Sequence, residues 1–89
     1  MIKTVALPNG VEISVDSERF DDMNMVDCLA EIEQGEILKL SQFFKMAFEP
    51  SDRAKIYTAC TDENGRVPIK AIQDMFSFIM KESGQEVKK

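Results

Sequence analysis

Histidine is absent from this sequence of 89 residues. Without histidine the chain lacks the most common general base, the Ser-His and Cys-His nucleophile pairs, and the usual ligand of zinc sites. Basic residues are also few, because 11 Lys and Arg accompany 16 Asp and Glu and leave a net charge of −5. A duplex-binding surface needs clustered cations, so we expect no nucleic-acid partner. The composition predicts a binding or assembly protein with no enzymatic activity, no cofactor and no metal site.

Long apolar runs are missing as well. No stretch approaches the 18–20 apolar residues of a membrane span, and the first residues lack the apolar run of a secretory signal. The two cysteines, Cys28 and Cys60, fall among apolar neighbours in helical patterns, which suits reduced, buried thiols. These observations predict a cytoplasmic protein without membrane contact.

The predicted fold class is α+β and mainly helical, with an N-terminal hairpin and about four helices. Alternation of Val11, Ile13 and Val15 with polar residues after Asn9-Gly10 predicts a β-hairpin over about residues 3–15. Apolar residues at helical spacing predict helices over about 22–34, 36–48, 51–60 and 68–82. We expect residues 1–84 to form one small domain and residues 85–89 a frayed tail.

Several local signals support these helices. Asp21 or Asp22 suits the N-cap of the first helix, and Gly35 suits its end. The apolar stripe expected in that helix is Met23, Val26 and Leu29 or Ala30, widened by Met25 and Ile32. The last helix has the most regular stripe of the chain, formed by Ile69, Ile72, Met75/Phe76 and Ile79/Met80.

The second predicted helix carries more large apolar groups than one buried face needs. Its core face is expected to consist of Ile37, Leu40, Phe44 and Phe48. Phe43 and Met46 would then point away from the core. In the last helix, Phe78 lies off the apolar stripe. The hypothesis is that a partner binds at Phe43, Met46, Phe48 and Phe78; the simpler alternative is a central helix whose apolar groups all pack in the core.

Two polar segments are candidate sites. The loop 62–67 lies between helices as a calcium loop would, but aligning Gly65 with the required glycine puts Cys60 and Ala71 at the end ligand positions. This loop is therefore expected to bind no calcium. The acidic residues of segment 16–36 are interpreted as a solvated face, with docking to a basic partner as the alternative use.

A set of short motifs, taken in order, resembles the small tail assembly chaperones of long-tailed phages and prophages of Gram-positive bacteria. The motifs are Val5-Ala6-Leu7-Pro8-Asn9-Gly10-Val11-Glu12-Ile13, Val15-Asp16 with Glu18-Arg19, Leu29-Ala30-Glu31-Ile32-Glu33, and Asp62-Glu63-Asn64-Gly65-Arg66-Val67-Pro68-Ile69. The resemblance spans nearly the whole chain. It departs from the family at residues 43–48, where the family often has a small-residue, proline- or leucine-rich stretch.

The resemblance implies a non-enzymatic protein that binds and solubilises the tape measure protein. It also implies recruitment of tail tube subunits through a frameshifted longer form, self-association into a homo-oligomer, and absence from the mature virion. This chain would be the short, unshifted form. The alternative function is an acidic prophage-encoded regulatory or inhibitor module. Such a module would be monomeric and would bind a basic site on a host protein in a salt-dependent way.

Overall fold

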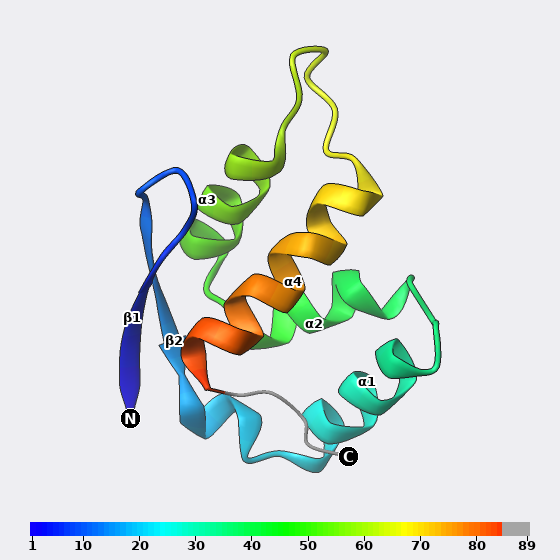
Figure 1. The fold of residues 1–89 in the computed structure, drawn as a ribbon. Helices are drawn as coiled ribbons and strands as arrows, with labels where there is room; N and C mark the ends of the chain where they lie inside the picture. Colours follow the sequence, from blue (N-terminus) through cyan, green and yellow to red (C-terminus); the bar gives the residue numbers. More distant parts are fainter. Residues whose placement is uncertain (85–89) are drawn as a thin grey trace.

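An antiparallel hairpin precedes four α-helices in the computed structural model, which describes residues 1–84 (Figure 1). The predicted α+β class is confirmed. The predicted tail, residues 85–89, lies outside the described residues. In chain order the elements are β1 (Ile2–Ala6), β2 (Glu12–Asp16), the 3₁₀ helix η1 (Ser17–Phe20), α1 (Met23–Glu33), α2 (Lys39–Ala47), α3 (Pro50–Cys60) and α4 (Ile69–Ser83).

The hairpin turn is longer than a two-residue Asn-Gly turn. The Gly10 amide donates to the Leu7 carbonyl at 2.8 Å, and the Leu7 amide donates to the Val11 carbonyl at 2.8 Å. Gly10 is left-handed with φ +88°, whereas Asn9 keeps a negative φ. Pro8 and Asn9 therefore form a type I turn, and Gly10 takes the one position that favours glycine.

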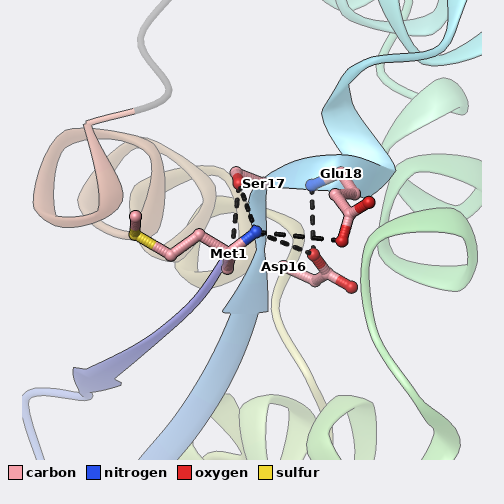
Figure 2. A network of polar contacts seen from close by, with 4 residues as sticks. All are labelled: Met1, Asp16, Ser17 and Glu18. Carbon is pink, nitrogen blue, oxygen red and sulfur yellow. Dashed lines mark hydrogen bonds and ion pairs between the residues drawn. The ribbon is translucent and has the colours of Figure 1, made fainter.

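The open end of the hairpin is closed by a polar network at Met1, Asp16, Ser17 and Glu18 (Figure 2). The Ser17 amide donates to the Met1 carbonyl at 2.9 Å, and the Met1 amino group donates to Ser17 Oγ at 3.1 Å. The same amino group lies 3.9 Å from carboxylate oxygens of Asp16 and Glu18. Those exposed ion pairs stabilise little, so the hydrogen bonds to Ser17 are what hold the first residue in register.

Both ends of α1 match the residues that the sequence indicated. The Asp22 carboxylate accepts from the Asn24 amide at 2.9 Å, which confirms the predicted N-cap. At the other end, the Gly35 amide donates to the Ile32 carbonyl and the Glu36 amide donates to the Glu31 carbonyl, each at 3.0 Å. This pair of bonds is a Schellman motif, and it requires the left-handed φ of +94° at Gly35.

The face of α1 that packs inward matches the predicted stripe only in part. Met25 and Leu29 of that stripe are buried, together with Cys28, while Met23 and Val26 are exposed. Both sets have helical spacing, so the period alone does not distinguish them. The correction follows from the packing of α1 against η1 and α2, which selects the stripe containing Cys28.

The second helix is shorter than predicted and begins at Lys39. Residues 36–38, which the sequence assigned to this helix, form a turn after the Schellman motif. Ile37 was expected in the core but is partly exposed, because it lies in this turn and outside the helix. The third helix begins with Pro50 at its first position, where proline needs no amide bond.

An aromatic cluster occupies the centre of the core. Phe43 of α2 is fully buried, with 0% of its surface exposed. Its ring centroid lies 6.1 Å from that of Phe20 in η1, 5.2 Å from Phe44, 6.2 Å from Phe48 and 4.9 Å from Phe76 in α4. The expectation that Phe43 points away from the core is therefore wrong. The helix has neighbours on more than one side, so its second apolar face is buried as well.

We expect Phe43→Ala to lower the free energy of unfolding by about 3–5 kcal/mol, because the cavity left by the ring cannot be filled by its neighbours. The loss is a large part of the stability of a domain of this size. Urea unfolding followed by far-UV circular dichroism measures it. A loss below about 1 kcal/mol, as expected at an exposed position, would contradict the central placement of this ring.

Candidate functional site: an apolar groove between α2 and α4

A hollow lined mainly by apolar side chains lies between the start of α2 and the first turns of α4. It has a volume of about 180 Å³. Leu40 lies at the start of α2, Tyr57 comes from α3, and Ile72 comes from α4. We call this hollow the apolar groove; its lining residues are Ile37, Leu38, Leu40, Ser41, Tyr57, Ile69 and Ile72.

Two aliphatic side chains of the groove are strongly exposed. Leu38 has 88% of its surface exposed, and Ile69 has 62% exposed. Leu38 lies in the turn before α2, and Ile69 is the first residue of α4 after Pro68. Neither position lets the side chain reach the core, because each precedes the helical turn that packs inward. An apolar surface of this kind on a small domain is typical of a binding surface.

A second hollow of about 250 Å³ adjoins the groove. Ile37 and Leu40 line both hollows, so the two share a wall. The second hollow is more polar, because Glu33, Gln73 and Ser77 contribute to its lining. Together the two hollows form one surface. It is apolar where Leu38 and Ile69 lie and polar where Glu33, Gln73 and Ser77 lie.

The structure does not bring the four predicted contact residues together on the surface. Phe43 and Phe48 are buried in the aromatic cluster and offer no surface to a partner. Met46 is half-buried, with its sulfur accepting from the Gln42 side-chain amide at 3.8 Å. Phe78 is half-buried and lies in a different hollow, next to Pro8 of the hairpin turn and Cys60 of α3.

Sequence reasoning missed Leu38 and Ile69. Large side chains at adjacent positions in a helix cannot all face one way, and the signal was present in the neighbouring Ile37 and Leu38, which follow Gly35 and Glu36. The predicted helix over 36–48 placed both residues inside a helix, whereas α2 begins at Lys39. Ile69 was assigned to the buried stripe of the last helix, although the first turn of a helix often lies beyond the core.

The two thiols are protonated structural groups. Cys28 Sγ donates to the Lys39 carbonyl at 3.5 Å, and Cys60 Sγ donates to the Ala71 carbonyl at 3.7 Å. Burial raises the pKa of both thiols above its ordinary value; at Cys28 the nearby Lys39 opposes this and Glu31 adds to it. Such thiols are poor nucleophiles, because the thiolate is the reactive form.

The loop between α3 and α4 is closed by its own residues. Asp62 Oδ1 accepts from the amides of Asn64 and Arg66, each at 2.9 Å, and the Asp62 amide donates to the Arg66 carbonyl at 2.7 Å. The carboxylate is therefore used to shape the loop. Within residues 1–84, no group of three or more His, Cys, Asp or Glu side chains is placed to hold a metal ion.

Comparison with known proteins yields no relative. No family model matches the chain, and no curated protein or solved structure shows a significant similarity to it. In the described part of the chain, none of the helices has the length and apolar character to traverse a bilayer.

Thiol labelling tests the placement of the cysteines. We expect a disulfide reagent to modify Cys28 and Cys60 at least tenfold more slowly in the folded protein than in urea at pH 8, because burial removes access and keeps the thiols protonated. Raising the pH through about 8.5, the ordinary thiol pKa, should accelerate labelling of the unfolded chain more than that of the folded chain. Equal rates in the two states would contradict the assignment of these thiols to the core.

Proposed function

We propose that this protein is a phage tail assembly chaperone that holds a helix of the tape measure protein in the apolar groove. The observation that carries the proposal is the exposed aliphatic surface at Leu38 and Ile69 beside a hollow lined by apolar side chains. An amphipathic helix presents apolar side chains at i, i+3, i+4 and i+7, and such a groove takes those anchors. The family resemblance in the sequence supplies the identity of the client.

The electrostatic character of the chain suits this task. A chaperone must keep a complex with an apolar client soluble, and a net charge of −5 on 89 residues favours solubility. In the described chain the charged side chains are mostly exposed, away from the groove lining. A long client would be covered by many copies, so that weak contacts at single grooves add up through avidity.

The proposal includes the wider biology of the family. The protein acts in the bacterial host cytoplasm, works as a homo-oligomer, contacts tail tube subunits through a frameshifted longer form, and leaves before the virion is complete. The nucleotide sequence tests this part. We expect a slippery heptamer near the codons for Lys88-Lys89, an overlapping reading frame, and a very long helix-coding gene downstream.

Binding to the client tests the groove. We expect L38S/I69S to weaken binding of the helix-rich protein encoded downstream by at least about a hundredfold, since burying each of the two side chains contributes about 1.5–3 kcal/mol. Co-expression followed by measurement of the soluble client fraction, and titration of a purified client fragment, give the readout. The variant should unfold at the same urea concentration as the parent, because both side chains are exposed.

The matched control is Met23→Ser, since Met23 is also a large exposed apolar residue but lies on α1, outside the groove lining. Equal effects of the control and the groove variant would show non-specific apolar contact and overturn the groove assignment.

The salt dependence of binding distinguishes the chaperone from the alternative, an acidic inhibitor. Groove binding is driven by apolar burial and should survive high salt, whereas binding of an acidic inhibitor to a basic site should weaken steeply.

A further inference from the structure

The two edges of the hairpin are unequal. In an antiparallel pair, alternate residues bond to the partner strand and the others direct their amides and carbonyls outward. Leu7 bonds to Val11 and Ser17 to Met1, with Val5 opposite Ile13 in the same register. The odd-numbered residues of β1 therefore bond to β2. The even-numbered residues of both strands direct their backbone groups to the outer edges.

The outer edge of β2 is covered by α3. The Ser14 amide donates to Asp52 Oδ2 at 3.4 Å, and the Lys55 ammonium donates to the Glu12 carbonyl at 3.3 Å. Asp52 and Lys55 are themselves 3.7 Å apart and form an ion pair. Charged side chains placed along a strand in this way are the usual protection against pairing with another chain.

The outer edge of β1 has no such cover. Within residues 1–84, the outward amides and carbonyls of Ile2, Thr4 and Ala6 are joined to no other group. All three residues are exposed, and β1 forms the margin of the fold in Figure 1. None of the three outward-bonding residues is charged and none is proline; the one charged residue of β1 is Lys3, whose own amide and carbonyl point to β2.

We propose that two copies of this chain pair through the outer edge of β1, antiparallel, with Thr4 opposite Thr4 of the second copy. In this register Ile2 lies opposite Ala6 of the second copy, so all three outward-facing residues of each chain are bonded. The two hairpins become one four-stranded sheet in the order β2–β1–β1–β2. A lone two-stranded hairpin is marginal, and the added pairing removes its free edge.

Side-chain chemistry selects this register and a second copy as the occupant. The cross-strand pairs on the outer face are Thr–Thr and Ile–Ala, which are neutral and compatible with a sheet. Moving the register by two residues in one direction would place Lys3 opposite Lys3 of the second copy, a repulsive pair. Moving it in the other direction would place Ile2 opposite Pro8, which has no amide to donate. In the proposed register Lys3 lies opposite Val5 of the other chain. The exposure of Lys3 shows that the helices leave this end of the strand open.

The pairing is independent of the groove function. The edge residues Ile2, Thr4 and Ala6 are absent from the groove lining, so a dimer can form whether or not a client binds. With the client, a dimer presents two grooves, and this gives the first step of avidity. A L38S/I69S variant that loses client binding but still dimerises would bear on the groove alone. An edge variant that loses the dimer but still binds the client would bear on the β1 edge alone.

Cross-linking tests the register. We expect Thr4→Cys to form a disulfide-linked dimer under mild oxidation at least tenfold faster than Ser14→Cys, because only Thr4 meets its own copy at the two-fold axis. Ser14 is the matched control, since it is opposite Thr4 in the hairpin, exposed, and on the covered strand. The parent, with Cys28 and Cys60 buried, should form no linked dimer. Equal rates for the two variants would overturn the proposal.

Mass measurement tests the edge itself. Sedimentation equilibrium of the parent should give twice 10.1 kDa as concentration rises, and Thr4→Pro should stay at the monomer mass. Proline at this position removes only an amide that points outward, so the bonds to β2 remain. Thr4→Val keeps the amide and should still dimerise, with circular dichroism checking the fold of each variant. A parent that remains monomeric, or a Thr4→Pro variant that is folded and dimeric, would overturn the proposal.

Discussion

The burial of Phe43 is the constraint on which the rest of this fold depends. Its ring touches aromatic side chains from η1, α2 and α4, so one residue joins segments that are distant in the sequence. A domain of this size has few such contacts, and its core is correspondingly small. Apolar residues that lie just before a helix or at its first position are left at the surface. Leu38, Ile69 and Met23 are the outcome.

The apolar groove and the open edge of β1 lie on different parts of the surface. The apolar groove lies where the turn before α2 meets the start of α4, and its lining comes from side chains. The open edge of β1 is a backbone surface, and its affinity for another strand comes from hydrogen bonds. The proposed partner helix and the proposed second copy would therefore use different chemistry and different parts of the molecule. Under the two proposals, a client and a second copy would bind at the same time.

Local signals in the sequence predicted the element order well. Asn9-Gly10, Asp22 and Gly35 each act through bonds to their nearest neighbours, so their roles need no tertiary context. The apolar faces were less predictable. Met23 and Val26 have the same spacing as Met25 and Cys28, and only packing against α2 and η1 decides which pair is buried. Phe43 and Phe48, two of the four predicted contact residues, are buried by packing that the period does not reveal.

The sequence by itself determined that the chain would be a hairpin followed by helices, with no histidine-based chemistry and an acidic charge. These properties follow from composition, turn residues and periodicity, which act over a few residues. Only the tertiary structure decided that Phe43 is central, that Leu38 and Ile69 border a groove, and that α3 covers one sheet edge and leaves the other open. Each of those outcomes depends on which segments meet across the core, and a helical or strand period carries no information about the partner it will face.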